Sequence, residues 1–110
     1  MGVTVKVFPE TDSDGHLKDL RDWSDDVADE IARREGLVEL TAEHWSVVRL
    51  ARSFYERTGV VPAMRPLVKL VTEHLGSVNG NSLFLLRLFP GSPARLVAKI
   101  AGLPRPTNCI

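Results

Sequence analysis

Four stretches of the chain each begin with a helix start signal, continue with apolar residues at helical spacing and end at a glycine. The start signals are a serine or threonine that can cap a helix, or a proline in the first turn. Glycine is the residue that most often follows a helix end. The stretches cover residues 23–36, 40–59, 60–76 and 92–102. This pattern predicts a mostly α-helical protein.

The start signals also indicate where each helix begins. The predicted capping residues are Ser24, Thr41 and Ser92. Pro66 has no N–H group to donate and belongs in a first turn, so the third helix should begin near residues 63–65. The apolar run "LFLLRLFP" at residues 83–90 lacks β-branched residues, which favours a short buried helix over a strand.

The N-terminal segment carries a strand signal instead. Residues 3–8, "VTVKVF", alternate β-branched with other side chains, and turn-forming residues follow in "TDSDGHL" at 11–17. A strand returning over residues 16–18 would complete a small β-hairpin. We therefore expect a compact helical bundle with helix-turn-helix-like elements, a small N-terminal β-hairpin and a flexible C-terminal arm.

Length and composition limit the possible classes of protein. A chain of 110 residues is enough for one domain, residues 1–110, with one core. No apolar run approaches the roughly 20 residues of a membrane span, and the N-terminus lacks a signal-peptide layout. With one cysteine and three scattered histidines, neither an internal disulfide nor a metal site is expected, and no cofactor is indicated. A reducing cytoplasm is the expected location.

The charges are unevenly distributed although the formal net charge is zero. Residues 1–43 hold twelve acidic and five basic side chains, whereas residues 44–110 hold two acidic and nine basic ones. Such a split predicts a basic surface suited to an anionic partner. The alternative is that the two halves interleave in space and their charges cancel, and the sequence leaves both possibilities open.

The last residues read "LPRPTNCI" and are expected to leave the core as an arm. Pro104 and Pro106 remove backbone donors and bias the residues before them toward extended backbone. The arm is predicted over residues 102–110, and if straight it could reach about 30 Å.

The only cysteine, Cys109, is the next-to-last residue of the chain. A thiol at an unprotected terminus is poorly explained as a core residue, so we interpret it as a reactive group. A cysteine protease needs a fixed base and an oxyanion site, and a redox switch needs a second cysteine. What remains is a carrier, whose thiolate attacks sulfur on another protein's cysteine and later surrenders it.

Other polar residues have less specific roles. Arg95, Lys99 and Arg105 could guide an anionic partner or lower the pKa of the thiol, and ordinary solubility is the competing explanation. His44, at a helix start, is expected to be packed or capping. His16 and His74 are expected at the surface.

The second and third predicted helices could also form a DNA-binding helix-turn-helix, with Arg65 and Lys69 facing the phosphates. The third helix lacks the Asn or Gln residues that read bases, so we treat DNA binding as a lesser alternative.

Several segments resemble the TusE/DsrC family of sulfur-relay proteins over nearly the whole chain. They are "DGHLKDLRDWS", "LTAEHWSVVRLARSFY", "PAMRPLVK", "GNS", "RLFP" and "KIAGLPRPTNCI". The resemblance implies a helical fold with a flexible C-terminal arm and Cys109 as the sulfur carrier. The DsrC branch has a second cysteine eleven positions upstream of the penultimate one, where this chain has Ala98. That difference points to the TusE branch.

In that branch the resemblance implies a place in a sulfur relay. The protein would accept persulfide sulfur from a TusBCD-like complex and pass it to an MnmA-like tRNA 2-thiouridylase, which modifies the wobble uridine. Transfer RNA would be contacted through that partner, and no membrane is involved. The alternative is a DsrC-like partner or substrate subunit of an enzyme of the sulfite-reductase type.

Overall fold

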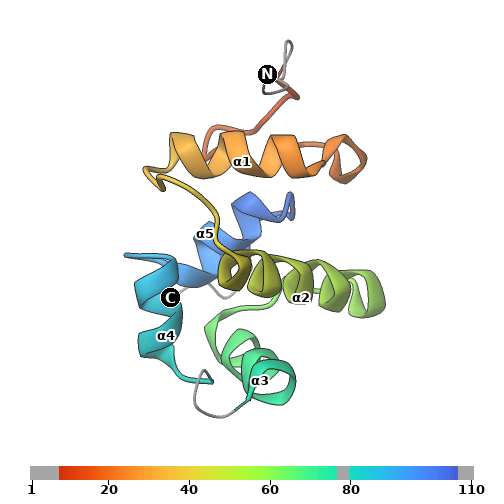
Figure 1. Cartoon of the computed structure of the whole chain (residues 1–110). Coiled ribbons are helices and arrows are strands. Elements are labelled where there is room, and N and C mark those ends of the chain that lie inside the picture. The colour runs from red at the N-terminus through yellow and green to blue at the C-terminus, as the bar shows by residue number, and fades with distance from the viewer. Residues whose placement is uncertain (1–7, 77–79, 107–110) are drawn as a thin grey trace.

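The computed structural model describes residues 8–76 and 80–106, and over these residues the chain is helical (Figure 1). A short 3-10 helix, η1 (Leu20–Asp22), precedes five α-helices. They are α1 (Asp25–Arg34), α2 (Ala42–Thr58), α3 (Met64–Leu75), α4 (Ser82–Leu88) and α5 (Pro93–Ile100). The mostly helical fold and all five predicted helices are confirmed, including the short helix in the apolar run.

The predicted start signals act as expected at most helices. The hydroxyl of Ser24 accepts a hydrogen bond from the backbone N–H of Val27 at 3.2 Å. Thr41 forms a capping box with His44: its hydroxyl accepts from the His44 N–H at 3.4 Å, and His44 Nδ1 accepts from the Thr41 N–H at 3.0 Å. Ser92 stands at the cap position of α5 but its side chain makes no capping hydrogen bond.

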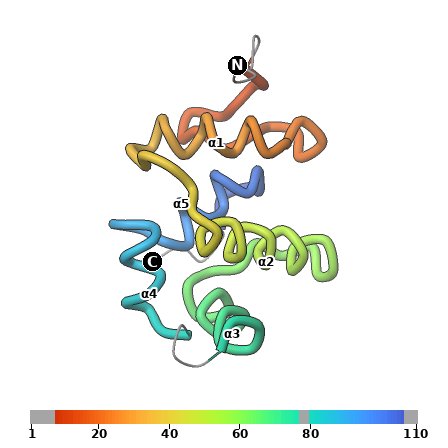
Figure 2. The backbone as a smooth tube through the Cα atoms, in the orientation of Figure 1, coloured from red at the N-terminus to blue at the C-terminus, as the bar shows by residue number. Residues whose placement is uncertain are grey.

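The last helix, α5, lies at the centre of the fold and contacts each of the other four α-helices. Five of its eight residues are buried: Pro93, Ala94, Val97, Ala98 and Ile100. Small residues such as Ala94 and Ala98 allow neighbouring helices to approach closely. In the backbone trace α5 lies between α1 and α2 (Figure 2), and the residues that follow it, 101–103, are also buried.

The predicted N-terminal β-hairpin is wrong. Residues 1–7, which hold most of its first strand, lie outside the described residues. Where the return strand was expected, the described chain holds a single antiparallel bridge between Thr11 and Leu17 and no strand. Two features restrict the pairing. Pro9 has no N–H to donate, and Leu17 turns into the core just before the chain enters η1.

Within the part of the chain that the structure describes, no helix combines the length and the apolar character needed to cross a bilayer.

Candidate functional site

Cys109 lies outside the described residues, and so the structure describes only the root of the C-terminal arm, residues 101–106. The root begins with a Schellman motif, the six-residue turn that commonly ends a helix. The N–H of Leu103 donates to the carbonyl of Ala98 at 2.8 Å, and the N–H of Gly102 donates to that of Lys99 at 3.0 Å. Gly102 takes the left-handed backbone conformation that this motif requires, with φ of 72°.

Gly102 also lies against an aromatic ring. A Cβ atom at this position would lie 2.5 Å from Cδ1 of Trp23, so no side chain fits there without displacing the indole. Trp23 follows η1 and precedes α1. The chain therefore needs glycine here for two separate reasons, the backbone angle and the space.

Three side chains from different elements donate hydrogen bonds to backbone carbonyls around the root. Trp23 Nε1 donates to the carbonyl of Ile100 at 2.7 Å. Arg52 Nη1, from α2, donates to that of Ala101 at 2.6 Å. His16 Nδ1 pairs with the carbonyl of Leu103 at 3.0 Å, and because a carbonyl only accepts, Nδ1 carries the proton. We call these three residues, His16, Trp23 and Arg52, the root clamp.

Two of the clamp residues, Trp23 and Arg52, also contact each other. The guanidinium of Arg52 lies 3.9 Å from the centroid of the Trp23 ring, which places a cation over an aromatic face. Burial lowers the pKa of Arg52, and the nearby carboxylate of Glu56 opposes that change. An arginine remains charged despite such a shift, so the hydrogen bond to Ala101 is charge-assisted.

His16 was expected at the surface, and this prediction is wrong: its side chain is 1% exposed. A turn closed by Asp12 positions it. The carboxylate of Asp12 accepts from the N–H groups of Asp14 at 2.9 Å and His16 at 3.0 Å. Asp12 is exposed, and the slight desolvation of its carboxyl group acts to raise its pKa, but these hydrogen bonds outweigh that effect and hold the pKa below the ordinary value. No local signal predicts this burial, because the carbonyl that His16 binds is 87 residues away.

The other two histidines lie where the sequence predicts. His44 is buried, and its ring connects the start of α2 to the end of α4 through a hydrogen bond from Nε2 to the carbonyl of Leu88 at 2.8 Å. His74 is exposed on α3.

The rest of the described root packs on the fold. Leu103 and Pro106 are buried, whereas Pro104 and Arg105 are exposed. Arg105 forms an ion pair with Asp14 at 2.9 Å. The predicted arm is therefore held by the core as far as residue 106, and the mobility of the remainder stays a prediction.

The three basic residues proposed for partner binding do not form one exposed cluster. Lys99 pairs with Glu35 at 3.2 Å and its side chain is only 12% exposed. Arg105 pairs with Asp14. Arg95 is half-buried on α5. A role in partner binding remains a prediction for each of them.

The acidic and basic halves of the sequence partly interleave in space. Besides the pairs made by Lys99 and Arg105, the pair of Arg49 with Asp25 at 3.6 Å also joins the two halves. For these three cations, the alternative that the two halves interleave and their charges cancel is confirmed.

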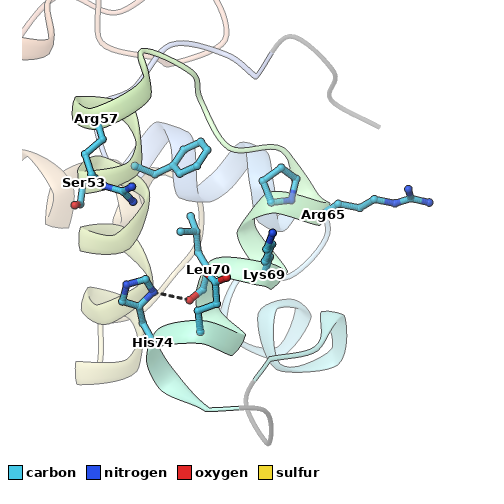
Figure 3. A pocket seen from close by; sticks show the side chains of 9 residues that line it. Ser53, Arg57, Arg65, Lys69, Leu70 and His74 are labelled. Carbon is cyan, nitrogen blue, oxygen red and sulfur yellow. Dashed lines mark hydrogen bonds between the residues drawn. The ribbon is translucent and has the colours of Figure 1, made fainter.

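The basic residues that escape this cancellation include a group beside a groove between α2 and α3 (Figure 3). The groove has a volume of about 670 Å³, and Arg57, Arg65 and Lys69 are among its lining residues. The sequence predicted Arg65 and Lys69 as residues that could face phosphates, but no sequence signal pointed to Arg57. Among the described residues, no cluster of three or more His, Cys, Asp or Glu side chains could hold a metal ion.

Comparison with known proteins places these features in context. The family model described as "DsrC like protein" matches residues 6–110. Sulfurtransferase TusE of Salmonella paratyphi A is 51% identical over 100 residues, which cover 91% of either chain.

Two solved structures share the fold. The NMR structure of Allochromatium vinosum DsrC superimposes with a TM-score of 0.82 at 44% identity, covering 90% of this chain and 88% of that one. The oxidised γ-subunit of the dissimilatory sulfite reductase (DsrC) from Archaeoglobus fulgidus gives 0.80 at 37% identity, covering 93% and 92%.

Proposed function

The chain belongs to the family of DsrC like proteins, and we propose that within this family it carries sulfur as a persulfide on Cys109. Its relatives named as sulfurtransferases support a general role in sulfur transfer. The single observation that supports Cys109 as the carrier atom is that it is the only cysteine in a chain matched by the family model through residue 110.

The proposed reaction is a thiol–persulfide exchange. The Cys109 thiolate attacks the outer sulfur of a donor cysteine persulfide, R–S–SH, and the donor thiolate R–S⁻ leaves. Cys109 becomes Cys–S–SH, one zero-valent sulfur has moved, and no external oxidant or reductant is required. A second transfer of the same kind unloads the sulfur and restores the thiol.

The absence of a second cysteine supports a carrier over a redox device. A neighbouring thiol could attack the loaded persulfide, form an internal disulfide and release the sulfur as hydrosulfide. Ala98 occupies the position on α5 where the DsrC branch has its additional cysteine, and it is buried. The loaded form of this chain has no such internal route of discharge.

We place the carrier between a TusBCD-like donor complex and an MnmA-like tRNA thiolase, as in the TusE branch. The groups that activate the sulfur would then lie on the partners, and the chain alone should show negligible turnover. The cytoplasm is the corresponding location.

Mass spectrometry after incubation with glutathione persulfide tests the carrier step. The protein should gain the mass of one sulfur atom, sensitive to reduction by dithiothreitol, and Cys109→Ser should gain nothing. Equal gain in both proteins would rule out Cys109 as the carrier. Transfer of radiolabelled sulfur from the loaded protein to tRNA, with the thiolase present, tests the placement in the relay.

A second candidate is a DsrC-like subunit of a sulfite-reductase-type enzyme, because the Archaeoglobus relative is named as the γ-subunit of such an enzyme. Copurification separates the two. A relay protein should retain the donor complex or the tRNA thiolase, whereas a reductase subunit should retain a sirohaem enzyme.

A further inference from the structure

The groove between α2 and α3 concentrates basic side chains that the structure leaves without ion-pair partners. Arg57 extends from the last turn of α2, and Arg65 and Lys69 stand four residues apart on α3, where the Arg65 side chain extends outward from the rim of the groove (Figure 3). Within the described chain, none of the three forms an ion pair, and all three are exposed. Among the described residues that line the groove, Glu73 is the only one with a carboxylate.

This arrangement differs from that of most other basic residues. The described cations that form ion pairs with nearby carboxylates are Arg21, Arg33, Arg34, Arg49, Lys99 and Arg105. Arg52 is committed to the root clamp. The excess positive charge in the second half of the sequence therefore concentrates partly at this groove.

The groove also offers apolar surface beside the cations. Leu70 is buried and Phe54 is half-buried, and the guanidinium of Arg57 lies 5.8 Å from the centroid of the Phe54 ring. Cations that track a phosphate backbone next to an aromatic side chain are a common arrangement in proteins that bind single-stranded nucleic acid. An acidic peptide would pair with the cations but has no nucleobase to stack on the Phe54 ring.

We propose that the groove formed by Arg57, Arg65 and Lys69 binds phosphate groups of RNA directly. The inference rests on the proposed function for the choice of RNA, since the acceptor enzyme of the relay acts on tRNA. The protein would then contact the RNA itself while it docks on that enzyme. Arginine presents a planar fork of donors that matches a phosphate, and lysine adds a point charge.

Salt dependence gives the proposal a quantitative form. Each phosphate that a cation neutralises contributes about −0.7 to −0.9 to the slope of log affinity against log salt concentration. Three contacts therefore predict a slope of about −2 to −3. Because the formal net charge of the chain is zero, affinity should be modest and best measured at low salt.

The test is fluorescence anisotropy with a labelled, unmodified tRNA transcript and the purified full-length chain. The variant Arg65→Gln/Lys69→Gln removes two exposed cations. It should raise the Kd about tenfold or more and reduce the magnitude of the salt slope by about 1 for each cation removed. The matched control is Arg21→Gln/Arg33→Gln, which removes the same charge from exposed positions on the acidic half of the sequence and should leave the Kd within twofold.

Several outcomes would overturn the proposal. Equal losses in the groove variant and the control would mean that only net charge matters, and an unchanged Kd in the groove variant would exclude the groove. Stronger competition by duplex DNA of the same length would favour the helix-turn-helix alternative. If the wild-type chain does not bind the transcript at low salt but the groove variant loses binding to the thiolase, the groove recognises an acidic protein surface instead.

Sulfur loading provides an independent readout. The groove variant should still gain one sulfur atom on Cys109 from glutathione persulfide, because its cations lie on α2 and α3 and not in the arm. Loss of RNA binding with loading intact supports the inference. Loading without any RNA binding by the wild-type chain rejects the inference and leaves the carrier function standing.

Discussion

Gly102 is the residue whose replacement should have the clearest effect on the root of the arm. Its φ of 72° belongs to the left-handed region, and the space where a Cβ would lie is occupied by Trp23. The chain contains a natural reference for separating the two effects. Gly59 has the same φ of 72°, and a Cβ there would meet nothing within 4 Å.

We therefore expect Gly102→Ala to destabilise the protein more than Gly59→Ala. The left-handed conformation costs a non-glycine residue about 1–2 kcal/mol at either position. Forcing a Cβ against the indole should add about 1–3 kcal/mol at Gly102 alone. Urea unfolding of the two variants measures the difference, and equal losses would show that Trp23 moves aside without cost.

Local signals predicted most of what single residues do, and distant contacts account for the rest. Ser24 and Thr41 cap their helices because a cap depends on neighbours within a few positions. His16 lies in a polar turn and carries no sign of burial, because its partner is the carbonyl of Leu103 at the other end of the chain. The carrier role of Cys109 was predicted from its position and from the family resemblance, and it stays a prediction because Cys109 lies outside the described residues.

The elements around the root show which parts of a helical fold a sequence reveals. The helices were predictable because each carries its own start, period and stop. The hairpin was not a sound prediction, since an alternating pattern does not say whether a partner strand is available. The root clamp was invisible for a further reason: Trp23, Arg52 and His16 come from three separate segments and meet only once α5 is centred in the core.

At the clamp, Arg52→Leu should loosen the arm. The change leaves the carbonyl of Ala101 without its charged donor, which costs about 1–3 kcal/mol, and it removes the stacking on Trp23. Hydrogen exchange at the amides of Gly102 and Leu103 should accelerate, because the Schellman motif loses its support. Urea unfolding together with exchange followed by NMR measures both effects.

Arg49→Leu is the matched control for that variant. Arg49 is also on α2 and also near an indole, 5.3 Å from the ring centroid of Trp45, but its ion pair is with the exposed carboxylate of Asp25 and not with a backbone carbonyl of the root. It should lose less than about 1 kcal/mol and leave exchange at the arm unchanged. Equal effects of the two substitutions would remove the clamp from the account.

In the molecule as a whole, the acidic N-terminal half and the basic C-terminal half are joined through α1 and α5. The contact between these two helices brings the end of α1 near Lys99, which pairs with Glu35. Among the six ion pairs between described residues, this pair is the most shielded, with side chains 12% and 28% exposed. Its partners lie 64 residues apart, so it reports on how the halves assemble.

A double-mutant cycle on Glu35→Gln and Lys99→Gln should give a coupling free energy of about 0.5–1 kcal/mol, at the upper end for a partly exposed pair. The corresponding cycle on Asp19 and Arg21, whose side chains are 43% and 89% exposed, should give no coupling beyond experimental error. Urea unfolding at low and high salt measures both, and the Glu35–Lys99 coupling should shrink as salt rises. Equal couplings would mean that shielding does not distinguish the pairs.

Under the proposed function, the burial of Pro106 shortens the segment that would carry the sulfur. Only three peptide links separate its Cα from that of Cys109, so the thiol-bearing residue can stray at most about 11 Å from this anchor. A segment of that length cannot reach into a deep channel of an acceptor enzyme unless the folded domain also lies against that enzyme. An enzyme that accepts the sulfur would therefore have to form an interface with the folded domain. The complementarity of that interface, more than the reach of the last residues, would then decide which acceptor enzyme receives the sulfur.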